Sequence, residues 1–274
     1  MPRARWSLAL VLLLAGNARA QRLQLELRPK VGDTLRMRLD QVTEVSGSRK
    51  GGRTATAMKT VVTTLTMFSR AIVESSAPGS ALILAVTDSV DVSSTDERAR
   101  SLGEATERQL RGRQMRLQLA PDGTVSVAPQ TTAVPKEVND LVSVMPASFP
   151  KDPVAVGESW DREMPIASAA SLGMPIGGVV RASFRLDSTA RGGDLAFISM
   201  RGTFEQQPAQ AASQSSLSGT VSGSMVVNRR RGWLSETTFL VEMRTTVVAR
   251  GVAPAAPMQF RMKITQHMRV VDKR

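Results

Sequence analysis

The chain has 274 residues and a formal net charge of +12, with no cysteine, no tyrosine and one histidine. The missing cysteines exclude disulfides, thiolate nucleophiles and Cys-ligated zinc or iron–sulfur sites, and a single histidine excludes multi-histidine metal sites. With 22% charged and 42% hydrophobic residues, the composition is that of a folded domain and not of a disordered chain. These counts give no reason to expect a metal or another cofactor.

Residues 1–20 have the pattern of a secretory signal peptide. Two arginines precede the apolar segment LALVLLLA at 8–15, and residues 18–20 form a small-x-small cleavage site. The apolar segment is far shorter than the roughly 20 residues of a membrane-spanning helix. We therefore predict an exported protein, periplasmic or secreted, with no transmembrane helix after cleavage. Because Gln21 and not cysteine follows the site, we expect no lipoprotein.

The dominant signal after residue 20 is a period-two alternation of apolar and polar residues, typical of antiparallel strands with one wet face. The pattern Met115, Leu117, Leu119 leads into a Pro121-Asp122-Gly123 turn and resumes at Val125 and Val127, which predicts a hairpin. Other residues that share a parity, and so predict one buried face per strand, are Leu35, Met37 and Leu39; Leu82, Leu84, Val86, Val90 and Val92; and Phe260, Met262 and Ile264.

Two helices are expected to interrupt the strands. Residues 94–113 begin with a capping box, Ser94-x-x-Glu97, and carry an apolar stripe that includes Leu102. A shorter helix is predicted over 135–145, with Pro135 at its start. The fold class is therefore mainly β (α+β): a large curved antiparallel sheet or half-open barrel of about ten strands with one longer and one short helix.

The region 21–274 is predicted to form a single β-rich domain, with two related halves, 21–130 and 150–274, as the alternative. The alternative comes from an internal similarity between Lys30-Val-Gly-Asp-Thr34 and Ala155-Val-Gly-Glu-Ser159. Duplication explains this similarity, and so does shared turn chemistry before a strand. The Ser- and Gln-rich segment 208–224 is expected to be a mobile loop or a weak edge strand.

The catalytic options are few. His267, the only imidazole, has the parity of the wet face in the last predicted strand, and no Gly-x-Ser-x-Gly motif accompanies it. The carboxylate pairs Asp88/Asp91 and Glu104/Glu107 are better explained as solvated residues. The sequence therefore predicts no catalytic residue and no enzyme, with a carboxylate-dependent hydrolase as the weakest alternative.

Candidate ligand-binding residues are Trp160, Trp233, Met115 and Met262. Both tryptophans follow a glycine turn and enter a strand, where large aromatic residues anchor a core or line an apolar cavity. Inward-facing methionines make a soft, adaptable apolar surface, or serve as ordinary core filler.

Arg229, Arg230 and Arg231 lie at a predicted hairpin tip and form the candidate basic surface. Such a tip could meet an anionic membrane surface, or could simply keep a sheet edge from pairing. Nucleic acid is not an expected partner, because aromatic residues for base stacking are scarce at 4% of the chain.

Several turn motifs carry a resemblance to a known family. They are Lys30-Val-Gly-Asp-Thr34 directly after the signal, Phe149-Pro150 followed by 153–160 (PVAVGESW), and Asn228 to Trp233 before a long strand. With these motifs the chain resembles an uncharacterised family of exported bacterial β-rich proteins with a Val-Gly-Asp/Glu-Ser-Trp motif. More remotely, it is similar to periplasmic lipoprotein carriers and lipid-binding lipoproteins, which implies a curved antiparallel sheet with helices over its concave side.

The leading functional hypothesis is an exported, non-enzymatic binding module that holds a lipid or another hydrophobic molecule on an apolar sheet face. The alternative is a structural or assembly protein of the bacterial envelope that acts through protein–protein contacts. The sequence does not specify the ligand, the partner proteins or the oligomeric state.

Overall fold

The structure is a computed structural model, which describes residues 22–51, 54–57, 59–129, 148–166, 178–206, 216–247 and 258–271. The predicted signal peptide and the predicted helix at 135–145 lie outside these residues. Among the described residues, no helix has the length and hydropathy that a transmembrane helix requires.

The described chain is almost entirely strand. Its elements in order are β1 (Thr34–Gly51), β2 (Thr54–Ala57), β3 (Val61–Ala77), β4 (Ser80–Ser94), α1 (Glu97–Leu110), β5 (Gln114–Leu119), β6 (Val125–Val127), β7 (Ser159–Ile166), β8 (Gly178–Ala190), the 3₁₀ turn η2 (Arg191–Gly193), β9 (Leu195–Gln206), β10 (Ser216–Asn228), β11 (Trp233–Val247) and β12 (Met258–Val270).

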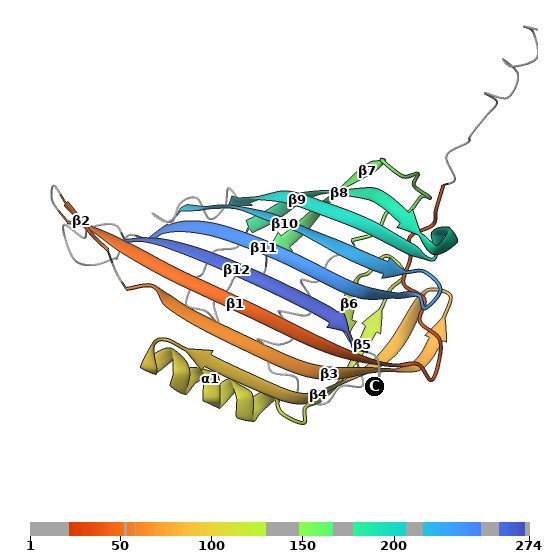
Figure 1. The fold of residues 1–274 in the computed structure, drawn as a ribbon, viewed down its shortest axis with the longest axis horizontal. Coiled ribbons are helices and arrows are strands. Elements are labelled where there is room, and N and C mark those ends of the chain that lie inside the picture. The colour runs from red at the N-terminus through yellow and green to blue at the C-terminus, as the bar shows by residue number, and fades with distance from the viewer. Residues whose placement is uncertain are drawn as a thin grey trace, which may run out of the picture.

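In the described part of the chain, twelve strands form one sheet in the order β6-β5-β4-β3-β1-β12-β11-β10-β9-β8-β7, with β2 paired to β1 off this path. Every pairing is antiparallel, and β1 pairs with β12, so the first and last strands lie side by side in the middle of the sheet. Figure 1 shows the sheet curving away from the viewer toward its two edges, β6 and β7. The predicted curved antiparallel sheet is thus confirmed.

The two faces of the sheet differ in chemistry, as the alternation predicts. Strand positions on the side of Leu35, Met37 and Leu39 face inward, toward the buried core, and the positions between them face outward. Following the pairing register across the sheet puts Met115, Met225, Met243, Met262 and Met268 on the inward face. The outward face carries mostly charged and hydroxyl side chains.

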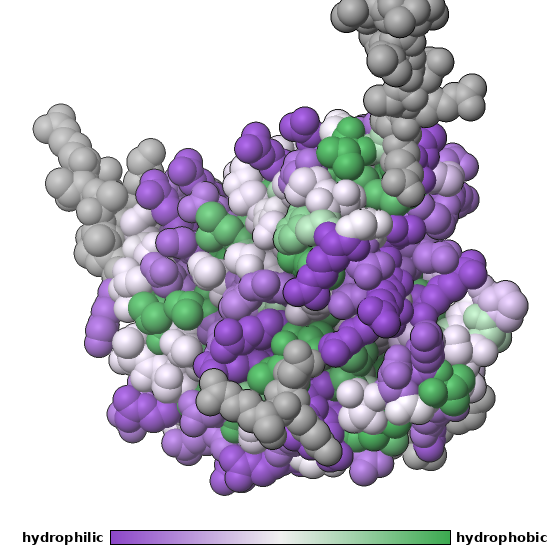
Figure 2. Space-filling model, turned by 45° about the vertical axis from the view of Figure 1, so that its right-hand side comes forward, coloured by the Kyte–Doolittle hydropathy of each residue, from purple (hydrophilic) through white to green (hydrophobic). Residues whose placement is uncertain are grey.

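One end of the curved sheet is closed by residues 22–28, which we call the strap. Its backbone crosses the strand ends: Leu23 forms a β-bridge with Val154, Leu27 N–H donates to Pro121 O at 2.8 Å, and Arg28 N–H donates to Gly232 O at 3.0 Å. Leu23, Leu25 and Leu27 are buried in the core, and the residues between them are not. In Figure 2 this end is covered mostly by hydrophilic residues, with apolar residues in separate patches.

The two similar sequence segments form the same turn. Gly32 and Gly157 have positive φ values, +86° and +91°, a conformation that suits glycine. Gly32 N–H donates to Val73 O of β3, and Gly157 N–H donates to Leu186 O of β8. A register shift follows each acceptor, between Val73 and Ser75 and between Leu186 and Ser188. The similarity therefore extends from sequence to hydrogen bonding and to the neighbouring bulge.

A bulge makes the prediction of a single buried face wrong for β4. Val86 pairs with Arg70, an outward residue of β3, whereas Val90 pairs with the inward Met67. The register shifts between these pairs, with Asp88 as the extra residue of β4. A bulge inserts one residue and so exchanges the faces of all later positions.

Helix α1 begins later than predicted. Its N-cap is Asp96, whose carboxylate accepts from Ala99 N–H at 3.0 Å; Ser94 is the last residue of β4. The predicted apolar stripe was also wrong, because Leu102 is 65% exposed and Gly103 is the buried residue. Gly103 faces Val92 so closely that a Cβ would lie 2.6 Å from Val92 Cγ1. The helix thus packs on β4 through a residue without a side chain.

The prediction for segment 208–224 was wrong where the structure describes it. Residues from Ser216 onward belong to β10, an interior strand between β9 and β11. The inward positions of β10 carry Leu217, Val221 and Met225, so its serines face outward.

Candidate ligand-binding face

The inward face at the closed end is filled by the chain itself. Phe149 is fully buried, and its N–H donates to Asp122 O at 3.0 Å. The rings of Trp160 and Phe184 stack with centroids 5.8 Å apart, and Trp160 Nε1 donates to Ser148 O at 2.8 Å. Together with the strap leucines, these side chains form a packed core.

Beyond this core the inward face combines apolar side chains with the uncharged polar residues Gln41, Thr43, Thr63, Thr245 and Gln266. Pairing register places a set of half-buried side chains there, which we call the open half: Leu65, Val45, Ile264, Met262, Phe260, Met243 and Leu217. None of them belongs to the buried core cluster or to the partly buried side chains packed against it. Among the described residues, the segments that cross the inward face lie at the closed end, apart from α1, which packs on the inward Val92 at the β4 edge. The open half is therefore an apolar wall that the described chain does not fill.

Two inward glycines shape the sheet here, Gly219 beside Met243 of the open half and Gly223 beside Phe239 at the edge of the core. A Cβ on Gly219 would lie 2.3 Å from Glu242 O, and one on Gly223 would lie 2.5 Å from a ring carbon of Phe239. The same Cβ on Gly219 would lie 3.1 Å from a ring carbon of Phe204. Glycine permits this close approach of neighbouring strands and rings, and glycine is the residue that lets a sheet curve sharply.

The structure does not bring the four predicted ligand residues together. Trp160 is 9% exposed and belongs to the packed core. Trp233 is half-buried against the same core, and its Nε1 has no hydrogen-bond partner. Met115 and Met262 both face inward, but β5 and β12 are separated by β4, β3 and β1. Of the four residues, Met262 lies in the open half.

The predicted hairpin tip exists between β10 and β11, but its three arginines differ in burial and in hydrogen bonding. Arg229 is half-buried, and its Nη1 donates to Gly193 O at 2.8 Å, which ties the tip to η2. Asn228 Oδ1 accepts from Arg231 N–H at 3.0 Å and shapes the turn. Arg230 and Arg231 are exposed. Arg229 therefore has a structural contact that its sequence context did not indicate.

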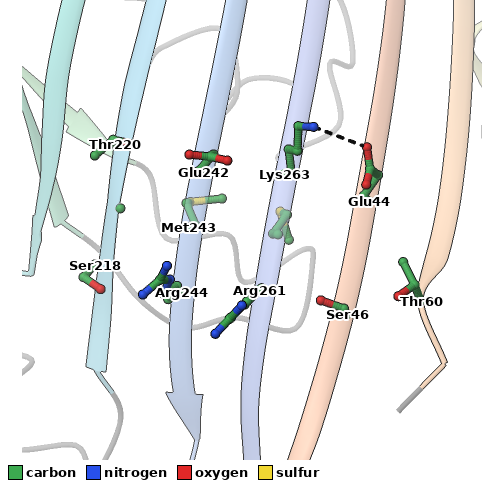
Figure 3. Close-up of a pocket in the computed structure, with 12 residues that line it drawn as sticks. Glu44, Ser46, Thr60, Ser218, Thr220, Glu242, Met243, Arg244, Arg261 and Lys263 are labelled. Carbon is green, nitrogen blue, oxygen red and sulfur yellow. Dashed lines mark ion pairs between the residues drawn. The ribbon is translucent and has the colours of Figure 1, made fainter. Parts of the chain in front are cut away.

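The outward face holds a pocket of about 560 Å³ over β10, β11, β12 and β1. Figure 3 shows Arg244 and Arg261 next to each other in it, and the register places them directly opposite across β11 and β12. Beside them, Lys263 Nζ lies 3.8 Å from Glu44 Oε1. Neither Arg244 nor Arg261 forms an ion pair with a described residue, so this pocket presents two guanidinium groups that an anion could bridge.

The acid–base candidates lie on the outward face or on α1, and three of them have side-chain partners. His267 Nε2 lies 2.7 Å from Glu236 Oε1, Asp88 accepts from Arg70 Nε at 2.8 Å, and Glu107 pairs with Arg111. The described residues contain no cluster of three or more His, Asp or Glu side chains that could hold a metal ion.

One carboxylate shows a clear electrostatic effect. Arg38 Nη2 donates to Asp40 Oδ1 at 2.8 Å, and this hydrogen bond is the main cause that lowers the pKa of Asp40. Thr66 Oγ1 donates to the same oxygen at 3.1 Å and acts in the same direction. Arg38 also lies over the Phe68 ring, 5.5 Å from its centroid. This outward cluster is a brace across β1 and β3.

Comparison with protein-family models gives no match, and comparison with curated proteins gives none. Among solved structures, the chain is similar to lipovitellin in a study of its lipid–protein interactions, with a TM-score of 0.48 and 9% identity over 89% of this chain. The chain spans 25% of that lipovitellin chain.

Two smaller proteins are also similar over 89% of this chain. The outer-membrane protein OprG from Pseudomonas aeruginosa has a TM-score of 0.22, 8% identity and 95% of its own chain covered. The outer-membrane protein AlkL has a TM-score of 0.21, 10% identity and 92% of its chain covered. All three similarities are too distant to indicate a function.

Proposed function

We propose that this protein binds an apolar molecule, such as a lipid, against the inward face of the open half. The observation that carries the proposal is the apolar wall around Met243, Met262 and Phe260, which lies outside the packed core. When a ligand removes the remaining surface of half-buried apolar side chains from water, the free energy of the system falls, which favours binding. Methionines suit such a wall because they are flexible and polarisable.

The role proposed is binding and not catalysis. The titratable groups nearest to a catalytic arrangement are His267 with Glu236 and Asp88 with Arg70, and both pairs lie on the outward face, away from the apolar wall. We also propose export, on the basis of the signal pattern in residues 1–20. Mass spectrometry of the protein from its native host should then give a chain that begins at Gln21.

The decisive experiment is native mass spectrometry of the protein purified without detergent, followed by titration with Nile red, an uncharged apolar dye. We expect an added mass that organic extraction removes, and saturable dye binding. The substitution Met262→Gln keeps the side-chain length but puts an amide on the wall, so dye affinity should fall about tenfold. Arg261→Gln is the matched control, because the neighbouring residue faces outward, and it should leave the affinity unchanged.

A protein that carries no extractable mass and binds no dye would contradict the proposal. Stable partners recovered by crosslinking such a protein would instead support the envelope-assembly alternative.

A further inference from the structure

Arg162 breaks the apolar character of the inward face. On β7 it lies between Trp160 and Met164, which face inward, and the register pairs it with the inward Ala182. Among inward-facing strand positions whose side chains the structure describes, Arg162 is the one charged residue. Its sequence neighbours Asp161 and Glu163 are exposed on the other face.

The guanidinium of Arg162 has hydrogen bonds but no counter-ion. Nη2 donates to Phe149 O, and Nη1 donates to Asp161 O at 3.4 Å. Nε is buried and has no hydrogen-bond partner. No carboxylate of a described residue forms an ion pair with Arg162.

This arrangement is costly unless an anion completes it. A charge that is partly removed from water loses hydration energy, and two neutral carbonyl acceptors return only part of it. A guanidinium binds a carboxylate or phosphate through two parallel hydrogen bonds. Each Nη of Arg162 donates one hydrogen to a backbone carbonyl and keeps a second, and these second hydrogens are the donors that such a head group would use, because Nε is enclosed.

The position of Arg162 connects this charge to the apolar wall. The row that starts at Arg162 continues through Ala182 and Gly202, so the strand positions directly beside Arg162 on β8 and β9 carry no large side chain. The same row then passes through Val221 and Val241 and reaches Ile264 of the open half. The row on the other side holds Trp160 and Phe184 of the packed core. The next row on the open side, Met164, Val180 and Phe204, still packs with the core, and it leads through Gly219 to Met243 of the open half.

We propose that Arg162 binds the head group of an anionic amphiphile, a carboxylate or phosphate on an apolar chain, whose chain lies along the open half. This inference rests on the proposed function and specifies its ligand class. The head group replaces the missing counter-ion, and the chain covers the half-buried apolar side chains.

The test uses competition with bound Nile red on the full purified protein. Dodecanoate, dodecyl phosphate and dodecanol share one apolar chain and differ in head group. In the wild-type protein, at least one of the two anions should displace the dye about tenfold more tightly than dodecanol, because a charge-assisted pair adds to the chain's contribution. The two anions distinguish a carboxylate ligand from a phosphate ligand.

Arg162→Gln should abolish the preference for the anion and leave dodecanol affinity unchanged, whereas Arg162→Lys should keep part of it. Arg201→Gln is the control, since Arg201 lies beside Gly202 but faces outward. Equal wild-type affinities for dodecanol and both anions would overturn the inference and leave the proposed function intact. Failure of all three compounds and of the dye would overturn the proposed function itself. The wild-type comparison does not depend on whether Arg162→Gln folds well, and an anion preference that survives in a folded Arg162→Gln protein would also overturn the inference.

Discussion

The closed end and the open half are made by the same strands but differ in what packs against the inward face. At the closed end, strap leucines and Phe149 fill the concave side, and Trp160 stacks on Phe184. In the open half, Met243, Met262 and Phe260 are half-buried and outside the core cluster. The closed end is packed like a protein interior, whereas the open half keeps part of its apolar surface exposed. The difference shows that the alternation of apolar and polar residues predicts which face of the sheet is apolar, but not what covers that face.

The largest expected difference between the two regions comes from removing a phenylalanine in each. Phe149→Ala should lower the free energy of unfolding by about 3–5 kcal/mol, because it leaves a cavity in a packed site. Phe260→Ala should cost clearly less, because Phe260 is only half-buried. Urea unfolding of both variants measures this, and equal losses would show that the two regions are packed alike.

The attachment of the strap can be tested at Gly232. Its φ is +63°, and a Cβ would lie 2.1 Å from Arg28 O, so alanine forces the strap and the tip apart. The left-handed conformation alone costs a non-glycine residue about 1–2 kcal/mol. Gly232→Ala should therefore lower stability and increase hydrogen exchange at the Arg28 N–H. Gly79→Ala, which meets open space, should do neither; if Gly232→Ala also left the Arg28 exchange unchanged, the strap would not depend on this contact.

The outward pocket permits a smaller test. Arg244→Glu converts an opposed pair of like charges into an attractive pair with Arg261. Stability at low salt should rise by about 0.2–1 kcal/mol, as for other cross-strand pairs. The gain should shrink in 1 M salt, where screening is strong. A gain that is independent of salt would mean that charge is not its source.

The smallest expected effect concerns the brace at Asp40. Because its pKa is lowered in the folded state, Asp40 adds stability above its unfolded pKa, and this is lost as the pH falls through the folded pKa. Asp40→Asn should therefore be slightly less stable than the wild type at neutral pH, and the difference should vanish in acid. Thermal unfolding from pH 7 downward tests this, and a difference that persists in acid would assign the effect to geometry.

Local features of the fold were predictable from sequence. The hairpin through Pro121-Asp122-Gly123 formed as predicted, with Gly123 at φ +91°. The bulge at Asp88 was not predictable, because an extra residue in a strand has no sequence signature and still inverts the faces beyond it. The pairing of β1 with β12 could not be predicted either, because the alternation specifies which face of a strand is apolar and not which strand lies next to it.

The candidate site was predictable in kind but not in place. Inward methionines were correctly assigned, yet the tryptophans belong to the core or its border. Arg162 could have been found, because it lies two residues after Trp160, which was predicted to enter a strand, and so shares its parity. It was missed because arginine is ordinarily a residue of the wet face.

The pairing of β1 with β12 also sets the order in which the sheet can be completed. Met37 of β1 pairs with Val270 of β12, so the central ladder joins the first and last described strands, which are made far apart in time during synthesis. Until β12 arrives, β1 has β3 on one side and an unpaired row of backbone donors and acceptors on the other. Contacts at such sequence separation form slowly. A nascent chain of this protein therefore keeps an open edge at the centre of its future sheet until β12 has been synthesised, and a chaperone that binds extended chains would protect this edge for the longest time.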